Sequence, residues 1–239
     1  LHLAAEPSVY PCQRDPWAWT TTTAVLSCVP VEAGQWDVVL GESPFYPEGG
    51  GQPSDLGSIG AALVRDVRAV GGALVHRTDA PVEGDVEARV DGARRLDHMQ
   101  QHSAQHLISA IAADQLGLAT VGFHLGAEST TIDLDGPLSP TALAALNEAV
   151  DAAIQANLSI RFMEVEAGEL AGLGVRTRGL PDGLVGPVRL VEIEGLDVNT
   201  CGGTHVDSTG ALHVVVVHRT ERHKGGTRLS FRAGGRAVR

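Results

Sequence analysis

Two short motifs in this chain carry residue types that bind metals. The segment 102–106 holds His102 and His106, and the segment 201–205 holds Cys201 and His205. On a helix, residues at i and i+4 lie on one face a turn apart, so the first two imidazoles can bind one ion together. Three imidazoles and one thiolate match the ligand types and the ligand number that Zn²⁺ accepts in tetrahedral geometry. The four residues therefore predict one zinc ion per chain, provided that the fold brings the two motifs together.

Each pair alone is a weak signal, because two helical histidines often belong to an ordinary solvated or hydrogen-bonded face. The combination of both pairs is more specific. A zincin protease would carry glutamate directly after the first histidine as its general base. Ser103 occupies that position in this chain, so the protease interpretation is excluded.

The composition is that of an ordinary globular protein. The chain has 239 residues, of which 43% are hydrophobic, enough for one large or two small cores. No targeting segment and no membrane-spanning stretch is expected. Three cysteines without a CxxC motif suit a reducing compartment, and we expect a cytoplasmic protein.

Residues 1–92 are predicted to form a small β-barrel. β-Branched runs alternate there with Gly, Pro and Asp, and no long helical period interrupts them. Short strands at close spacing favour a closed sheet, because closure removes exposed edges. The predicted strands are 20–29, 36–40, 58–70, 73–77 and 86–90.

Residues 93–239 are predicted to form an α+β domain, with an antiparallel sheet packed against two helices. The first helix is expected over 97–116, with Asp97 as N-cap and Gly117 after its end, and His98 is interpreted as an exposed or capping residue. The second helix begins with Ser139 as N-cap and Pro140 at its first position. Further strands are expected over 129–135, 159–165, 187–193, 212–219 and 227–231, and a loop over 168–186.

The two motifs carry a family resemblance. HxxxH followed far downstream by CGGTH resembles the editing domain of alanyl-tRNA synthetases and of the free-standing alanyl-tRNA editing proteins, the AlaX family. The segment Ser43–Gly57 resembles the glycine-rich FYxExGGQxxDxG segment that precedes this domain. The resemblance implies zinc-dependent hydrolysis of mischarged tRNA, with Cys201, Gly202, Gly203 and Thr204 in the catalytic loop.

A substrate pocket is implied beside these motifs. Gly50, Gly51 and Gln52 admit two interpretations: a backbone that approaches a ligand closely, with an amide to bind it, or a tight turn of the barrel with positive φ. The resemblance favours a place beside the amino-acid pocket. It also makes Thr120 and His124 candidates for substrate contact, although either can simply be a strand residue.

The charge distribution bears on a nucleic-acid partner. A net charge of −11 argues against a broad nucleic-acid surface, since affinity for phosphate comes from Lys and Arg. The last 21 residues nevertheless carry seven basic residues against one acidic residue. Five of them are predicted to contact the acceptor end of tRNA: Arg219, Arg222, Lys224, Arg228 and Arg232.

The implied substrate is seryl-tRNA of alanine identity, with the glycyl form as a second candidate. An apolar alanine pocket cannot strongly reject serine, which merely adds a hydroxyl, so a separate site must remove it. Two alternatives stay open: a hydrolase acting on seryl-tRNA of threonine identity, and a zinc-stabilised tRNA-binding module without catalysis. No phosphate-binding loop is visible, so no nucleotide cofactor is expected, and the sequence does not indicate an oligomeric state.

Overall fold

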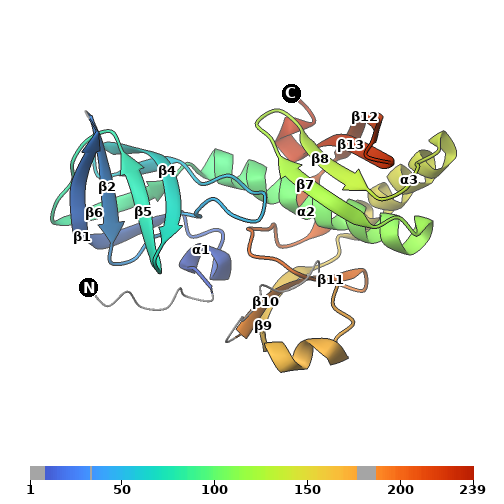
Figure 1. Ribbon diagram of the computed structural model, residues 1–239, viewed down its shortest axis with the longest axis horizontal. Helices are drawn as coiled ribbons and strands as arrows, with labels where there is room; N and C mark the ends of the chain where they lie inside the picture. The colour runs from blue at the N-terminus through green and yellow to red at the C-terminus, as the bar shows by residue number, and fades with distance from the viewer. Residues whose placement is uncertain (1–8, 33, 177–186) are drawn as a thin grey trace. The chain divides into compact units, whose positions relative to one another are not determined.

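The computed structural model of the protein describes residues 9–32, 34–176 and 187–239 (Figure 1). Two compact units are distinguished. The barrel unit comprises the described residues up to Leu96 together with Gly202–Thr204, and the C-terminal unit comprises Asp97–Cys201 and His205–Arg239. The change of unit lies between Leu96 and Asp97, a few residues after the boundary at residue 92 that the sequence predicts.

The predicted N-terminal barrel is confirmed. Six antiparallel strands close in the order β1-β2-β5-β4-β3-β6, preceded by a one-turn helix α1 (Pro11–Arg14). The predicted run 58–70 is two strands rather than one, because Gly60 adopts a φ of 56° and turns the chain between them. The strands are β1 (Thr20–Glu32), β2 (Gln35–Leu40), β3 (Gly57–Ile59), β4 (Ala62–Val70), β5 (Ala73–Thr78) and β6 (Asp85–Val90).

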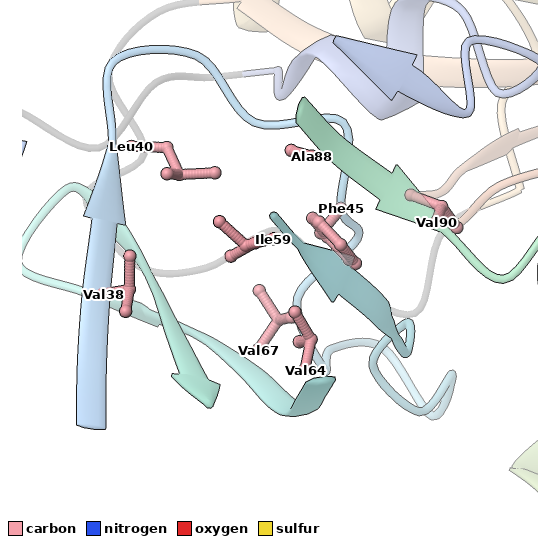
Figure 2. Packing of buried hydrophobic residues seen from close by; sticks show 8 residues of the cluster. All are labelled: Val38, Leu40, Phe45, Ile59, Val64, Val67, Ala88 and Val90. Atoms are coloured by element: carbon pink, nitrogen blue, oxygen red, sulfur yellow. The ribbon is translucent and has the colours of Figure 1, made fainter. Parts of the chain in front are cut away.

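The interior of the barrel is filled by apolar side chains from successive strands. Figure 2 shows Val38, Leu40, Phe45, Ile59, Val64, Val67, Ala88 and Val90 converging on one cluster. Alternate residues of a strand face opposite sides of the sheet, which is why Val38 and Leu40 both point inward. Burial of these apolar side chains stabilises the barrel unit.

The C-terminal unit is α+β, as predicted, but its strands form two antiparallel sheets. One sheet has the order β12-β13-β8-β7 and the other β11-β10-β9. The strand β11 was not predicted from the sequence. The strands are β7 (Thr120–Leu125), β8 (Thr130–Leu134), β9 (Ile160–Glu166), β10 (Pro187–Ile193), β11 (Asp197–Thr200), β12 (Val215–His223) and β13 (Gly226–Ala233).

The helix α3 (Pro140–Ala156) begins as its sequence predicts. The hydroxyl of Ser139 accepts a hydrogen bond from the backbone N–H of Ala142, and Pro140 occupies the first turn. Its apolar side, which includes Leu146 and Val150, is buried. Among the described residues, short 3₁₀ segments complete the fold: η1 (Ala167–Gly172), η2 (Thr209–Leu212) and η3 (Gly234–Arg236). η1 lies in the predicted loop 168–186, of which residues 177–186 fall outside the described residues.

The helix α2 (Gly92–Leu116) starts earlier than predicted. Asp91 caps it, because its carboxylate accepts from the N–H of Arg94, whereas Asp97 lies inside the helix and pairs with Arg236. The predicted N-cap was therefore wrong, since the polar first turn concealed the true start. His98 is buried rather than exposed. Gly117 follows the helix with a φ of 65°, as expected for a C′ residue.

The middle of α2 is buried on every side. All ten residues from Met99 to Ile108 are buried, including several polar ones. Gln101 exchanges two hydrogen bonds with the backbone of Ala233, both 2.9 Å long, and Gln100 donates to the carbonyl of Ala211. Buried amides are tolerated because their hydrogen bonds are satisfied by neighbouring backbone.

Candidate metal centre

The four predicted metal ligands meet within the C-terminal unit. The donor atoms of His102, His106, Cys201 and His205 all lie within 4.8 Å of one another. The Sγ of Cys201 lies 3.4 Å from Nε2 of His102 and 3.3 Å from Nε2 of His205. The three histidines are buried, whereas Cys201 is partly exposed.

These separations fit a tetrahedral metal ion. Zinc–nitrogen and zinc–sulfur bonds of about 2.0 and 2.3 Å place neighbouring donors of a tetrahedral site about 3.5 Å apart. The distances from the thiol to two imidazoles are close to this value. The cluster can therefore hold a metal ion with little rearrangement of the side chains.

Two elements supply the ligands. The helix α2 presents His102 and His106 on one face, and the loop after β11 presents Cys201 and His205. Arg189 of β10 fixes the start of this loop at two points: its carbonyl accepts from the N–H of Cys201 at 3.2 Å, and its guanidinium donates to the carbonyl of Cys201 at 2.7 Å. A backbone held at both groups keeps the thiol facing the helix.

The electrostatics of the cluster favour a thiolate. Burial alone would raise the pKa of the Cys201 thiol, but the neighbouring imidazoles, with His102 foremost, outweigh it and lower this pKa well below its ordinary value. Burial lowers the pKa of His205 to about 3. At His106 burial acts in the same direction, but the charges of Cys201 and Asp197 outweigh it and raise the pKa to about 9. Thiolate is the form of cysteine that binds metals.

Three contacts of the cluster were not predicted from the sequence. Ser103 places its Oγ 3.1 Å from Nδ1 of His205. Asp197 of β11 places Oδ2 3.4 Å from Nδ1 of His106. The ring of Phe123 lies 5.1 Å from the ring of His102, centroid to centroid. The HxxxH spacing pointed to Ser103 only as a residue that is not glutamate, and nothing in the sequence marked Asp197 or Phe123.

The glycine-rich segment forms a tight turn within the barrel unit. Gly50 and Gly51 have φ angles of 59° and 86°, and Gly49 and Gln52 exchange two backbone hydrogen bonds across the turn. Positive φ at both central residues is the conformation that glycine adopts most readily. The tight-turn interpretation is thus confirmed, while a contact with substrate stays a prediction.

The side chain of Gln52 is fully buried and forms two hydrogen bonds with Thr204. Its amide nitrogen donates to Oγ1 of Thr204 at 2.9 Å, and its amide oxygen accepts from the N–H of Thr204 at 3.1 Å. Both residues belong to the barrel unit. A second contact in this unit joins the side chain of Gln13 to the carbonyl of Gly202. The middle of the CGGTH loop is therefore fixed by side chains that donate to and accept from its backbone.

The predicted substrate residues of β7 differ in their surroundings. The hydroxyl of Thr120 donates to that of Ser109 on α2 at 2.7 Å. His124 is exposed and follows Phe123, so the alternation of the strand turns it away from the face that carries the Phe123 ring. The structure does not bring His124 to the metal ligands, and its role stays a prediction.

The predicted basic surface divides into two groups. Arg219, Arg222 and Lys224 are exposed on β12 and the turn that follows, and Arg219 donates to the carboxylate of Glu221 at 2.6 Å. Arg228 is held by both carboxylate oxygens of Asp133, at 2.6 and 2.8 Å, and the Nε of Arg232 donates to the carbonyl of Glu128. The first group is the better placed of the two to meet a polyanion.

Within the described part of the chain, no helix has the length and apolar character needed to cross a membrane. Cys12, Cys28 and Cys201, all of them described, form no disulfide with one another.

Comparison with known proteins identifies homologues. The family described as "Threonyl and Alanyl tRNA synthetase second additional domain" matches residues 188–230. The alanyl-tRNA editing protein Aarsd1 of Bos taurus is 40% identical over 244 residues, covering 95% of this chain and 55% of that protein. Aarsd1 of Danio rerio is 38% identical over 245 residues, covering 96% and 60%. The alanine–tRNA ligase of Natronomonas pharaonis is 35% identical over 217 residues, covering 85% of this chain and 23% of the ligase.

The resemblance inferred from the two motifs and the glycine-rich segment is thereby confirmed, because the similarity extends over nearly the whole chain. The chain itself spans between about half and three fifths of the length of these curated editing proteins.

Proposed function

Because its homologues over nearly its whole length are alanyl-tRNA editing proteins, we propose that this chain is an aminoacyl-tRNA deacylase that removes a wrong amino acid from tRNA of alanine identity. The observation that carries the proposal is the convergence of His102, His106, Cys201 and His205 on one point. We assign seryl-tRNA as the main substrate and glycyl-tRNA as the second, and we place the protein in the cytoplasm, where its thiols stay reduced.

We assign one zinc ion to the cluster. The donor set of three imidazoles and one thiolate, with separations that suit tetrahedral geometry, supports zinc over hard cations, which prefer oxygen ligands. When bound, zinc supplies a Lewis acid that polarises the ester carbonyl and acidifies water.

The reaction is ester hydrolysis. The oxygen of a water forms a bond to the carbonyl carbon of the amino acid, and the bond from that carbon to the terminal ribose oxygen breaks, leaving a free amino acid and a tRNA hydroxyl. Substrate would approach from the side of Cys201, because it alone of the four ligands is partly exposed. Gly202 and Gly203 follow Cys201 directly in the chain, and we assign their backbone N–H groups to stabilise the developing oxyanion.

Thr204 has a supporting role in this proposal. Its N–H and hydroxyl are both bonded to Gln52, so it fixes the loop rather than contacting the reacting atoms. Gly50 and Gly51 form the turn that presents Gln52 to this loop. Gly50, Gly51 and Gln52 would then affect the substrate indirectly, by holding this loop in position.

Selection for serine requires a hydrogen bond to its hydroxyl, since correctly charged alanine would leave that site unpaired. Thr120 is the first candidate to bind this hydroxyl. Its own hydroxyl donates a hydrogen bond to that of Ser109 on α2, so two hydroxyls lie together there. His124 is the second candidate.

The acceptor end of tRNA is proposed to contact Arg219, Arg222 and Lys224, with Arg228 and Arg232 behind them. The net charge of −11 makes this engagement weak and sensitive to salt.

The test measures release of the amino acid by the purified, zinc-loaded protein from three substrates. Seryl-tRNA of alanine identity should be deacylated much faster than alanyl-tRNA of the same identity. Equal rates, or none, would refute the proposal. A third arm uses seryl-tRNA of threonine identity, because the matching family covers both synthetases. Faster release of serine from that substrate would show that the enzyme acts on tRNA of threonine identity instead.

A further inference from the structure

We propose that Ser103 and Asp197 are positioning residues of the metal centre. They hold the rings of His205 and His106 by Nδ1, so that Nε2 of each ring is the nitrogen turned toward the metal. This inference rests on the metal binding in the proposed function and adds to it the residues that prepare the ligands.

The orientation of the His205 ring follows from its two neighbours. Nε2 lies 3.3 Å from the thiol of Cys201, and Nδ1, on the other side of the ring, lies 3.1 Å from Oγ of Ser103. A neutral imidazole carries its hydrogen on one nitrogen only. A ring that offers the Nε2 lone pair to a metal must therefore donate from Nδ1, and the Ser103 hydroxyl is the acceptor within reach.

Ser103 is itself held in place. It is fully buried on α2 between the two histidines of the HxxxH motif, and its Oγ also accepts from the N–H of Val206 at 3.2 Å. A hydroxyl has two lone pairs, so it can accept from Val206 and from His205 together. One buried hydroxyl thus joins the HxxxH helix to the residue after the last ligand.

Asp197 acts on His106 in the same way. Its carboxylate is almost completely buried, and its Oδ2 lies 3.4 Å from Nδ1 of His106. An ionised carboxylate only accepts hydrogen bonds, so the nitrogen that faces it must carry the hydrogen. Nε2 of His106 is then the nitrogen available to a metal.

A guanidinium lies beside the other oxygen of this carboxylate. The Nε of Arg176 lies 3.4 Å from Oδ1 of Asp197. The same side chain donates at 2.7 Å to both carboxylate oxygens of Asp114 and at 3.1 Å to the carbonyl of Ala110, both on α2. Arg176 therefore connects the ligand-bearing helix to β11, and Asp197 is oriented from two sides. Such contacts to the outer nitrogen of a metal-bound histidine raise its basicity and its affinity for the ion.

The experiment compares metal affinity in the full chain and three variants. Zinc affinity is measured by competition with a chelator, and Co²⁺ replaces zinc to report ligand geometry through its visible absorption. We expect Ser103→Ala and Asp197→Asn each to weaken zinc binding by about 10- to 100-fold and to change the Co²⁺ spectrum. Asp114→Asn, which only loosens Arg176, should have a smaller effect.

Two matched controls remove similar groups elsewhere in the C-terminal unit. Ser139→Ala deletes a hydroxyl that caps α3, and Asp135→Asn removes the carboxylate charge that accepts from the N–H of Ala119. Neither touches the four ligands, so both should keep the Co²⁺ spectrum of the unmodified chain. Denaturation of the metal-free forms is measured in parallel, so that a loss of folded protein is separated from a loss of affinity.

The outcomes distinguish two failures. If the unmodified chain binds neither zinc nor Co²⁺, the metal assignment of the proposed function is wrong. If it binds both, and Ser103→Ala and Asp197→Asn keep its affinity and spectrum, the positioning inference is overturned. The inference is equally overturned if their affinity falls only as far as their folded fraction does.

Discussion

Both units of this protein bury histidine, and the difference between their sites separates a structural imidazole from a functional one. In the barrel, both ring nitrogens of His76 have a partner: Nε2 lies 2.7 Å from the Ser43 hydroxyl and Nδ1 lies 3.0 Å from the carbonyl of Val38. In the C-terminal unit, the inner nitrogens of His102 and His205 meet the thiol of Cys201. The partners of His76 are oxygen atoms of the barrel, whereas three imidazoles and a thiol of the C-terminal unit form a donor set that can hold a metal ion.

The pKa values of the buried histidines depend on the charges around each ring. Burial lowers the pKa of His76 to about 4, so it is neutral at pH 7 and adds no charge to the barrel. His106, which is also buried, has its pKa raised to about 9, because Cys201 and Asp197 outweigh burial. Burial alone therefore does not fix the pKa of a histidine; the charges around the ring contribute as much.

The largest expected effect comes from removing a ligand. Cys201→Ala should lower the rate of seryl-tRNA deacylation by about a thousand-fold or more, because polarisation by a metal contributes several kcal/mol to the transition state. The metal content of the purified variant should fall in parallel. A variant that has lost its metal but keeps its full rate would show that the cluster is not the reactive site.

Acid should weaken the barrel through His76. Its pKa is near 6.5 in the unfolded chain and about 4 in the folded one, so the unfolded state binds a proton first as the pH falls. The free energy of unfolding should therefore be highest above pH 6.5 and decrease toward pH 4, by at most about 3 kcal/mol. Denaturant unfolding followed by tryptophan fluorescence reports this unit, because Trp17, Trp19 and Trp36 all lie in it.

His76→Leu is the matched test of the same residue. It removes the hydrogen bonds of the ring to the Ser43 hydroxyl and the Val38 carbonyl, so we expect a loss of about 1–3 kcal/mol in the free energy of unfolding at pH 7. The acid-dependent part assigned to His76 should vanish, while the deacylation rate per folded molecule stays unchanged. If the variant keeps the same pH dependence of unfolding, other groups must cause that dependence. If the variant loses deacylation activity, His76 takes part in the reaction.

The smallest expected effect concerns the surfaces. Several barrel arginines are paired with carboxylates, as Arg65 is with Asp79, whereas Arg222 and Lys224 lie at the surface of the C-terminal unit. Replacing either Arg222 or Lys224 by serine should raise KM by less than about tenfold and leave kcat unchanged. The slope of log KM against log salt concentration should fall by about one, which corresponds to one lost phosphate contact. Arg65→Ser is the control and should change neither KM nor this slope. Equal KM values at low salt would place the tRNA contact elsewhere.

The convergence of the four candidate ligands was predictable because their signal is local. The spacing of i and i+4 from His102 to His106, and the same spacing from Cys201 to His205, together mark the four residues that the structure brings within 4.8 Å of one another. The barrel was predictable for a similar reason, since β-branched runs and turn residues recur at short intervals. The caps of α3 at Ser139 and Pro140 also follow from a few adjacent residues.

What escaped prediction depends on contacts between distant segments. Asp197 opens a four-residue strand with little β-propensity, and only the pairing of β10 with β11 brings it to His106. The two hydrogen bonds from Gln52 to Thr204, far along the chain, were not predicted either. The start of α2 was placed about one turn too late, since Gly92 and two arginines have no apolar period to mark a helix.

The burial of α2 on every side from Met99 to Ile108 has a consequence for how this segment tolerates change. A helix with a solvent-exposed face can tolerate a one-residue deletion, because residues of that face can rotate without losing contacts. This segment of α2 has no solvent-exposed face. Each residue advances about 100° around the helix axis, so a single deletion before His102 would rotate both imidazoles away from the thiol. The same rotation would break the hydrogen bonds of the buried glutamine amides to the backbone. The segment is therefore expected to vary by substitution and never by length.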